Sequence, residues 1–352
     1  MKIDTLVIGQ GIAGSVLAYT LCQRGQRVVV VADKRPTSSA VAAGLFNPVT
    51  GRKLVKTWNA DVLFPYLIDF YQSLEKQLDT NFLHLRRIYR PFRSIAEQNQ
   101  FTAATADPEL VAYLTTEVNH EAYKHFIHNE LGGIETLQAG WLDTQLFLEK
   151  IRNYFKEKNF FRSETFDSQS LHLVNNSVQW QDVEASHVIF CEGESGRSNP
   201  YFSWLPFRPM KGEILQVNAD INNVQNIVNQ GVWMVPQLDK TIKIGATYDG
   251  QDITWQPTEK GRVYLKEHLE KLIKIDYSIE NQFAGIRPAT PDRRPLIGLH
   301  PEQQAVGIFN GLGSKGVSLA PFFANQFADF LMHKKELDPL VNIERYFSLY
   351  FK

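Results

Sequence analysis

The chain has 352 residues, of which 43% are hydrophobic, and a formal net charge of −1. This length favours two domains over a single core, and the composition is that of an ordinary globular protein. The near-zero charge gives no general attraction to nucleic acids or anionic membranes.

The two cysteines and the apolar runs exclude several other classes of protein. Cys22 and Cys191 cannot form a disulfide scaffold, and no Cys or His spacing typical of a metal site occurs. No apolar run approaches the roughly 20 residues that span a bilayer, and no separate signal segment precedes the first predicted strand. We therefore expect a cytoplasmic protein without a membrane span and without a metal.

The first predicted elements are a strand, a helix and a second strand within residues 3–33. The first strand is followed by Gly9, Gly11 and Gly14, which open an apolar helix, and the second strand ends just before Asp33. Glycines at these positions let the backbone approach a pyrophosphate, whose charge is stabilised by the helix N-terminus. Asp33 lies about 24 residues after the first glycine, within reach of ribose hydroxyls. This unit predicts a bound dinucleotide.

The next segment begins with a loop over residues 36–44 that is rich in Ser and Ala. Small residues are expected where the backbone lies close to a ligand. A helix is predicted over 65–77, a strand over Leu83–Ile95 and a short helix over Asp107–Tyr113.

Residues 140–205 are predicted to return to the first domain. Asp143 is a suitable N-cap for a helix whose apolar residues recur at helical spacing. The strand His187–Phe190 then leads into a second glycine turn at Cys191-Glu192-Gly193.

The last part of the chain combines sheet, helix and a further glycine-rich turn. The predicted elements are strands over 213–217, 231–235, 240–247 and 305–309, helices over 259–272 and 317–331, and the turn Gly311–Gly316.

Motifs in five parts of the chain occur in a regular order. They are Val31–Lys34 with Val41–Pro48, Pro209–Glu213, Met234–Pro236 with Ile244–Thr247, Gly285–Asp292 with Pro295–Gly298, and Gly311–Gly316 with Leu319–Pro321. Together they resemble the FAD-dependent D-amino acid oxidase superfamily, which includes glycine and sarcosine oxidases. The resemblance implies an α/β protein in which a Rossmann-type FAD-binding domain is interleaved with an antiparallel-sheet (α+β) substrate domain. We expect residues 1–79, 140–205 and 285–352 in the FAD-binding domain, and residues 80–139 and 206–284 in the substrate domain.

The resemblance and the glycine turns together imply the residues that hold FAD. Asp33 is expected at the adenine ribose, and the loop Ala42–Leu45 is expected to bring backbone N–H groups to the flavin ring. The helix after the last turn is expected to stabilise the negative charge that reduction places on the flavin. The expected cofactor-binding residues are Gly9, Gly11, Ile12, Ala13, Gly14, Ala32, Asp33, Lys34, Ala42, Ala43, Gly44, Leu45, Asn47, Phe166, Cys191, Glu192, Gly193, Arg287, Gly311, Leu312, Gly313, Ser314, Lys315, Gly316 and Val317.

Arg287 is the principal substrate-binding residue that the resemblance implies. It is expected to hold a substrate carboxylate in a bidentate fork; the alternative is an arginine that satisfies carbonyl groups between domains. Trp233 and Tyr248 are expected to line the catalytic pocket, with core aromatics as the alternative. Relatives often have tyrosine where Trp233 stands, and an indole cannot accept a hydrogen bond as a phenol does, which favours a different or larger substrate. Asn47, Arg52 and Lys53 follow the flavin loop, where charged residues suit either an anionic substrate or a solvated loop.

The resemblance implies an oxidoreductase that oxidises the C–N bond of an amino acid or secondary amine, with hydride transfer to the flavin and hydrolysis of the imine product. A second hypothesis is the same chemistry on a modified tRNA uridine, because Gly311–Gly316 also resembles the oxidase half of a tRNA wobble-uridine-modifying enzyme. Arg86, Arg87, Arg90 and Arg93 suit either phosphate contacts or a solvated strand face. A third hypothesis is a flavin-binding subunit without its own amine substrate.

Overall fold

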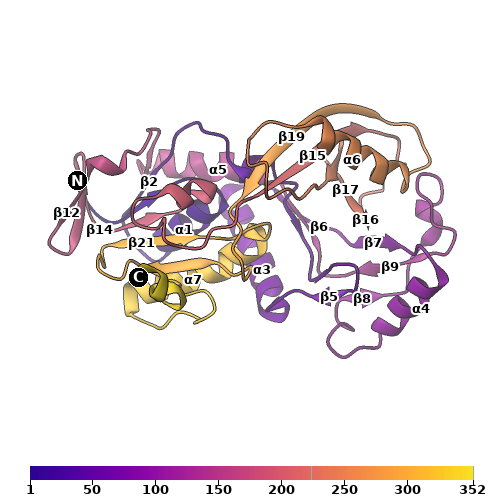
Figure 1. The fold of residues 1–352 in the computed structure, drawn as a ribbon, viewed down its shortest axis with the longest axis horizontal. Helices are drawn as coiled ribbons and strands as arrows, with labels where there is room; N and C mark the ends of the chain where they lie inside the picture. Colours follow the sequence, from indigo (N-terminus) through magenta and orange to yellow (C-terminus); the bar gives the residue numbers. More distant parts are fainter. Residues whose placement is uncertain (223, 352) are drawn as a thin grey trace.

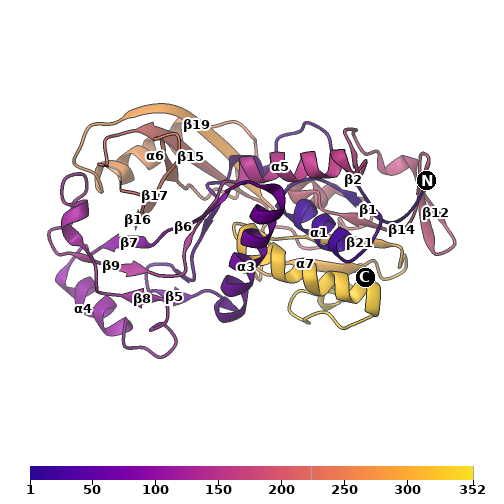
Figure 2. The same ribbon diagram turned by 180° about the vertical axis from the view of Figure 1, so that it is seen from behind.

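The computed structural model describes residues 1–222 and 224–351 and has two lobes with helix α3 (Ala60–Leu78) between them (Figure 1). One lobe holds both ends of the chain and a largely parallel sheet, and the other holds an antiparallel sheet. Seen from behind, a layer of helices lies in front of the parallel sheet and beside it (Figure 2). These helices are α1 (Ile12–Gln23), α3, α5 (Thr144–Glu157) and α7 (Gly316–His333).

The first sheet has the strand order β11-β2-β1-β14-β13-β12, with β21 beside β14 and β20 beside β21. Its central strands are parallel, and such sheets are covered on both faces, which explains their near-continuous apolar sequences. All four residues of β2 are buried, for example. The bounds are β1 (Lys2–Ile8), β2 (Val28–Val31), β11 (Phe161–Arg162), β12 (Leu171–Val174), β13 (Ser177–Trp180), β14 (Val183–Phe190), β20 (Leu296–Leu299) and β21 (Val306–Asn310).

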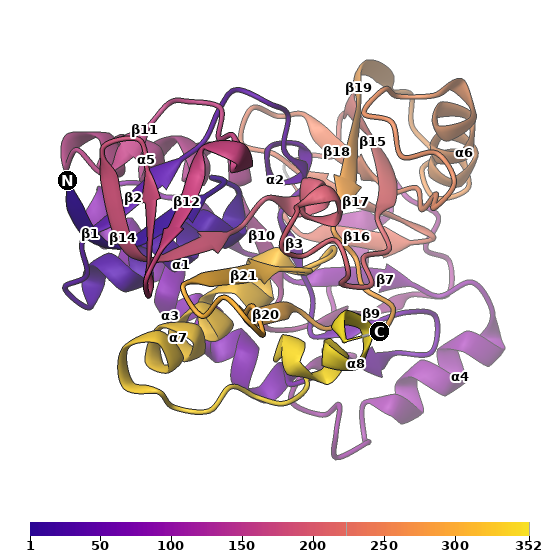
Figure 3. The same ribbon diagram turned by 60° about the vertical axis from the view of Figure 1, so that its left-hand side comes forward.

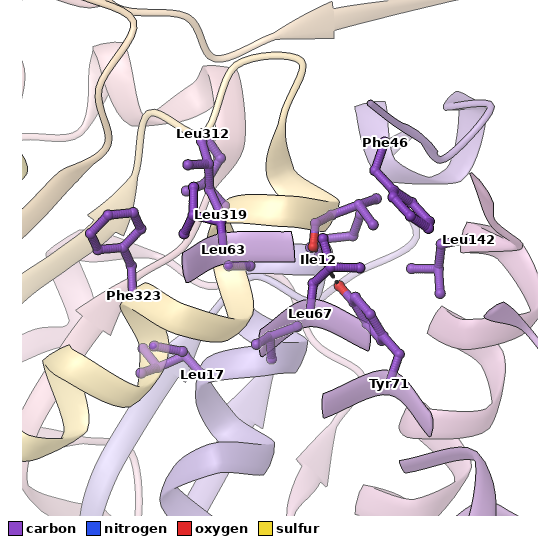
Figure 4. Packing of buried hydrophobic residues seen from close by; sticks show 14 of the residues in the cluster. Ile12, Leu17, Phe46, Leu63, Leu67, Tyr71, Leu142, Leu312, Leu319 and Phe323 are labelled. Atoms are coloured by element: carbon purple, nitrogen blue, oxygen red, sulfur yellow. Dashed lines mark hydrogen bonds between the residues drawn. The ribbon is translucent and has the colours of Figure 1, made fainter. Parts of the chain in front are cut away.

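The apolar core lies where α1, α3 and α7 pack together against the first sheet (Figure 4). Leu63 and Leu67 of α3 are fully buried, and Leu17 of α1 and Phe323 of α7 are fully buried with them. Tyr71 donates a hydrogen bond to the Val317 carbonyl oxygen at 3.3 Å, which ties α3 to the first turn of α7. This packing gives the glycine turns at the starts of α1 and α7 a rigid support.

The second sheet has the order β19-β15-β18-β17-β16-β7-β9-β8, and all of its pairs are antiparallel except β16 with β7. Helix α6 packs against one face beside β15 and β19 (Figure 3). The bounds are β7 (Ile88–Pro91), β8 (Leu114–Thr115), β9 (Gly133–Thr136), β15 (Met210–Asn218), β16 (Ile227–Gln230), β17 (Val232–Pro236), β18 (Ile242–Gly245), β19 (Ser278–Arg287) and α6 (Glu259–Glu270).

Side chains alternate between the two faces of this sheet. Lys211 and Glu213 of β15 lie on the face toward α6, and a Cβ atom at Gly261 of α6 would lie 2.5 Å from the Glu213 carboxyl carbon. Gly212 and Ile214 therefore lie on the opposite face, which faces the cavity described below.

Two small sheets and several short elements complete the fold. They are the sheet β3-β10-β6 (Leu45–Phe46, Gly140–Leu142, Leu83–Leu85), the hairpin β4-β5 (Val49–Thr50, Val55–Lys56), and the helices α2 (Ser38–Val41), α4 (Ile95–Ala104), α8 (Phe347–Tyr350), η1 (His120–Tyr123), η2 (Ser168–Ser170), η3 (Gly193–Ser198) and η4 (Ile343–Tyr346).

The prediction of one strand over Leu83–Ile95 was wrong, because the segment forms the short strands β6 and β7 and then enters α4. Ser94 caps α4 by accepting a hydrogen bond from the Glu97 backbone N–H, a capping signal that is visible in the sequence. The predicted helix over Asp107–Tyr113 was also wrong. That segment is a series of turns, in which the Asp107 carboxylate accepts a hydrogen bond from the Glu109 backbone N–H at 2.8 Å.

The division into two interleaved domains remains our proposal for the two lobes. Strand β19 pairs with β15 along its whole length up to Arg287, so the second sheet continues past the expected boundary after residue 284. The segment Gly285–Arg287 thus belongs to the antiparallel sheet, and the chain returns to the first sheet at β20.

Candidate active site

One cavity of about 1080 Å³ runs from the glycine turn after β1 to the face of the second sheet. Its lining contains every residue predicted for the site except Gly14 and Gly311. Both exceptions lie directly behind the lining, where a side chain would collide with backbone: a Cβ atom would lie 1.9 Å from the Gly9 carbonyl oxygen at Gly14 and 2.9 Å from the Leu296 nitrogen at Gly311.

The glycine turn after β1 brings bare backbone to one end of the cavity. Gly9 has a φ of +103°, and a Cβ atom there would lie 2.5 Å from the Cys191 carbonyl oxygen. The turn therefore requires glycine at this position. Helix α1 starts with its N-terminus at the cavity, where the Ile12 backbone N–H donates to the Ser39 hydroxyl at 3.1 Å. A helix N-terminus that lies this close to the cavity suits the binding of a pyrophosphate.

Asp33 lies in the cavity lining two residues after β2. Burial acts to raise the pKa of its carboxyl group, but hydrogen bonds from Arg35 outweigh burial, so this pKa lies below its ordinary value. Arg35 Nε lies 2.6 Å from Asp33 Oδ2. Asp33 is therefore ionised at neutral pH and can accept hydrogen bonds from ribose hydroxyls.

Glu192 and Phe166 line the same end of the cavity. Burial raises the pKa of the Glu192 carboxyl group, which accepts a hydrogen bond from Asn199 Nδ2 at 2.8 Å. Phe166 packs edge-on against Phe190 at the end of β14. This end therefore offers the Asp33 carboxylate and an apolar wall formed by Phe166, which suit an adenosine.

The loop Ala42–Leu45 lines the middle of the cavity. Gly44 has a φ of +68°, and a Cβ atom there would lie 1.8 Å from the Leu142 carbonyl oxygen, so the loop packs directly on β10. The Ala42 carbonyl oxygen accepts hydrogen bonds from Thr144 Oγ1 at 3.2 Å and from Lys243 Nζ at 3.4 Å. Because these hydrogen bonds hold the Ala42 carbonyl group in place, the loop can present backbone N–H groups to a planar ring in the cavity.

Asn47 follows this loop and lines the cavity, but its side chain also serves the local fold. Its Oδ1 atom accepts a hydrogen bond from the Val49 backbone N–H at 2.9 Å and closes a turn.

The turn Gly311–Gly316 places the N-terminus of α7 at the cavity. Lys315 lies at the N-cap position, and its Nζ donates to Thr57 Oγ1 at 3.3 Å. Burial lowers the pKa of the Lys315 ammonium group, and Arg293 and Arg294 lower it further. Arg294 lies with its guanidinium carbon 4.0 Å from the centroid of the Trp58 ring. A helix N-terminus with a cation beside it can stabilise negative charge that develops in the cavity.

Arg287 ends β19 at the substrate side of the cavity. Its Nη1 donates to the carbonyl oxygens of Lys211 and Thr247, each at 3.2 Å. Gly212 makes room for the guanidinium group, since a Cβ atom there would lie 2.0 Å from Nη2. In the part of the chain that the structure describes, no residue accepts a hydrogen bond from Nε or Nη2 of Arg287. One edge of the guanidinium group is thus anchored, and the other remains available for a carboxylate.

Burial lowers the pKa of Arg287, and Tyr248 acts in the opposite direction. Tyr248 is 68% exposed, and its ring centroid lies 4.4 Å from the Arg287 guanidinium carbon. The indole ring of Trp233 packs directly over Gly245, because a Cβ atom at Gly245 would lie 2.4 Å from the indole Cζ2. Both aromatic residues line the cavity, so neither is a buried core residue.

The arginine cluster of residues 86–93 divides between two places. Arg90 and Arg93 line the large cavity, whereas Arg86 and Arg87 line a separate shallow pocket. Arg87 forms an ion pair with the buried Glu135 at 3.0 Å.

The sequence interpretation missed several residues on the substrate side. They are Gly212, Ile214, Asn229, Trp255, Tyr264 and His268. Alternation along β15 is a signal for the first two, but the last three lie in a loop and a helix that come to the cavity only through the fold.

The described residues, 1–222 and 224–351, contain no group of three or more His, Cys, Asp or Glu side chains placed to hold a metal ion. None of their helices has both the length and the apolar character that crossing a membrane requires.

Comparisons with known proteins give a consistent assignment. The model of the FAD-dependent oxidoreductase family (DAO) matches residues 4–330. The tRNA 5-methylaminomethyl-2-thiouridine biosynthesis bifunctional protein of Marinobacter nauticus is 26% identical over 92% of this chain and 54% of its own length. The bifunctional protein ThiO/ThiG of Trichormus variabilis is 24% identical over 97% of this chain and 54% of its own length. The chain thus spans about half the length of these curated relatives.

Among solved structures, the glycine oxidase of Bacillus cereus superimposes with a TM-score of 0.78 at 19% identity, covering 95% of this chain and 96% of the other. This likeness confirms the predicted fold class, an α/β protein with a Rossmann-type FAD-binding domain. The cavity, with bare backbone at a helix N-terminus, an ionised acid at the ribose position and a second helix N-terminus, fits the predicted cofactor FAD. The chain belongs to the DAO family of FAD-dependent oxidoreductases.

Proposed function

We propose that this enzyme oxidises the C–N bond of an amine that carries a carboxylate, such as an amino acid or a secondary amino acid. The observation that carries the proposal is the arrangement of Arg287. Its Nη1 is fixed by two backbone carbonyl groups, while Nε and Nη2 have no acceptor among the described residues, and Arg287 lines the cavity that also contains the dinucleotide turn. A planar guanidinium with one free edge suits bidentate binding of a carboxylate.

The residues of this chain act mainly by orienting the substrate. FAD, when bound, would supply the acceptor for one hydride, which carries the two electrons of the oxidation. Arg287 holds the carboxylate, which fixes the direction in which the neighbouring carbon points. Trp233 and Tyr248 line the pocket on the substrate side. Because an ammonium group has no free electron pair to assist loss of the hydride, the amine must react in its neutral form.

The same chemistry on a modified tRNA uridine is the second candidate. Support comes from the Marinobacter nauticus relative, whose name refers to tRNA and which aligns with 92% of this chain, and from Arg90 and Arg93 in the cavity lining. A flavin-binding subunit without its own amine substrate is the third candidate. We also propose a cytoplasmic location, in which Cys22 and Cys191 stay reduced.

A matched pair of amines tests the proposed carboxylate requirement. Sarcosine and N-methylethanolamine present the same secondary amine, but only sarcosine carries a carboxylate. We expect kcat/KM for sarcosine to exceed that for N-methylethanolamine by about 100-fold or more, since a charge-assisted bidentate contact contributes about 3 kcal/mol or more. Equal values for the two amines would contradict the proposal. An FAD-loaded protein that oxidises neither amine, nor any carboxylated amine, would favour the third candidate.

A further inference from the structure

The charges that line the cavity are distributed unevenly. Its acidic lining residues, Asp33, Glu149, Glu164, Glu192 and Glu194, all lie at the dinucleotide end. On the substrate side the described lining has no carboxylate, although it contains Arg52, Arg90, Arg93 and Arg287. The binding of one carboxylate requires only Arg287, so the other three arginines are left without a function in the proposed reaction.

The side chains of Arg93 and His268 converge on the backbone at Gly231, which has no side chain of its own. A Cβ atom at Gly231 would lie 3.2 Å from Arg93 Nη2 and 3.5 Å from His268 Cδ2. His268 Nδ1 lies 2.8 Å from the Tyr264 carbonyl oxygen, which can only accept, so Nδ1 donates and Nε2 of the neutral ring can accept a hydrogen bond from a hydroxyl group. Arg93 is oriented by a hydrogen bond from its Nε to the Gln230 side chain. The absence of a side chain at Gly231 leaves a recess between a guanidinium and an imidazole.

Arg90 fixes the turn that carries Arg52. Its Nη1 donates to the Gly51 carbonyl oxygen at 2.8 Å and its Nη2 to the Arg52 carbonyl oxygen at 3.5 Å. Its Nε is buried and has no hydrogen-bond partner among the described residues. Glu97 lies 3.7 Å from Arg90 and partly balances its charge. In the described part of the chain, no carboxylate lies within ion-pair distance of Arg52 or Arg93, so these two cations remain unbalanced.

Aromatic rings contribute to the lining of the same cavity. Trp233, Tyr248, Trp255 and Tyr264 all line it, and Tyr264 packs against His268 with ring centroids 4.0 Å apart. Rings together with unpaired arginines are the combination that binds a base and a phosphate.

We propose that Arg52 and Arg93 form a second anion site beside His268. This site binds a phosphate group of the substrate while Arg287 binds its carboxylate. This inference rests on the proposed function and narrows its substrate to a carboxylated amine that is part of a nucleotide. The phosphate can belong to a free nucleotide or to a nucleic acid strand, and both present the same chemistry to the recess.

The test measures binding of uridine 5′-monophosphate and of a single-stranded oligouridylate to the FAD-loaded protein by isothermal titration calorimetry. Loading with FAD keeps the probes out of the dinucleotide end. We expect the double variant Arg52→Ala/Arg93→Ala to raise Kd at least about tenfold for the probe that binds. Arg86→Ala is the matched control: it removes the same charge from a residue outside the cavity, and its Kd should equal that of the wild type. The double variant Arg52→Lys/Arg93→Lys should retain part of the affinity. FAD content and melting temperature confirm that each variant is folded.

Each outcome has a definite meaning. If uridine monophosphate binds and depends on the two arginines, the second anion site is supported for free nucleotides. If only the oligonucleotide binds, the site is supported for a strand, and its salt slope should fall by about 1.4 in the double variant, as two lost phosphate contacts require. If neither probe binds, or if binding is the same in the double variant, the site is overturned. If probes bind as expected but no carboxylated amine reduces the flavin, then the proposed function fails while the anion site stands.

Discussion

Replacement of Arg287 by alanine gives the most specific prediction of this structure. The substitution removes the free guanidinium edge and also leaves the Lys211 and Thr247 carbonyl oxygens without their donor. Loss of one partner from a buried charge pair costs about 3–5 kcal/mol, and the lower value applies because Arg287 is only half-buried. At 1.4 kcal/mol per factor of ten, kcat/KM for sarcosine should fall by about 100-fold or more.

The assay compares two amines in two variants. Steady-state oxidation of sarcosine and N-methylethanolamine is measured for the wild type, Arg287→Ala and Arg287→Lys. The preference for sarcosine should disappear in the alanine variant and return partly in the lysine variant, which restores the charge without the planar fork. FAD content should be unchanged, since Arg287 is at the substrate side. An alanine variant with the same FAD content and a kcat/KM within about threefold of the wild type would refute the carboxylate contact.

Three further predictions concern the cofactor site and the stability of the fold. Gly14→Ala should abolish FAD binding, because its Cβ atom would lie 1.9 Å from the Gly9 carbonyl oxygen. The control Gly250→Ala, whose Cβ atom would lie 3.4 Å from its nearest neighbour, should bind FAD normally. The flavin absorbance of the purified proteins measures the FAD content of both variants. Burial lowers the pKa of His300 below its value in the unfolded chain, so the unfolded state takes up the proton first as pH falls. The melting temperature should therefore decrease below about pH 6.5, and His300→Asn should make this decrease smaller. An unchanged dependence of the melting temperature on pH in the variant would contradict this reasoning. Lys315→Met should lower the flavin midpoint potential by about 20–40 mV, which corresponds to the loss of about 1–2 kcal/mol of electrostatic stabilisation of the reduced flavin. A redox titration measures this potential. An unchanged potential would mean that Lys315 lies too far from the flavin ring to affect it.

Local sequence signals were sufficient for the first lobe. The glycine turn, helix α1 and strand β2 follow one another within 31 residues, from Ile3 to Asp33, and Asp143 caps α5 as expected, with its carboxylate 3.0 Å from the Leu146 nitrogen. Such signals act between neighbouring residues, so a sequence reveals them directly. The error over Leu83–Ile95 came where short strands pair with distant segments, whereas Asp107–Tyr113 forms turns. For example, β7 pairs with β9 and with β16, which lies more than 100 residues further on.

The candidate site could be predicted as far as its motifs reached. The glycine turns and Arg287 lie within short motifs, and the fold brings them into one cavity. The recess at Gly231 had no such signal in the sequence. Arg93 follows β7 and His268 belongs to α6, and only the fold brings these two side chains close to Gly231. Charge patterns along the chain likewise could not separate Arg90, which lines the large cavity, from Arg87, which pairs with Glu135.

The central claim is that this FAD-dependent enzyme takes electrons from a carboxylated amine, and anaerobic reduction of the bound flavin tests it most directly. The visible absorbance of the FAD-loaded protein is recorded without oxygen while glycine, sarcosine, D-amino acids and a carboxymethylaminomethyl nucleotide are added in turn. We predict that at least one of these amines bleaches the flavin band in the wild type, and that the same amine bleaches it far more slowly in Arg287→Ala. A fully loaded protein whose flavin none of them reduces, although dithionite does, would contradict the proposed reaction.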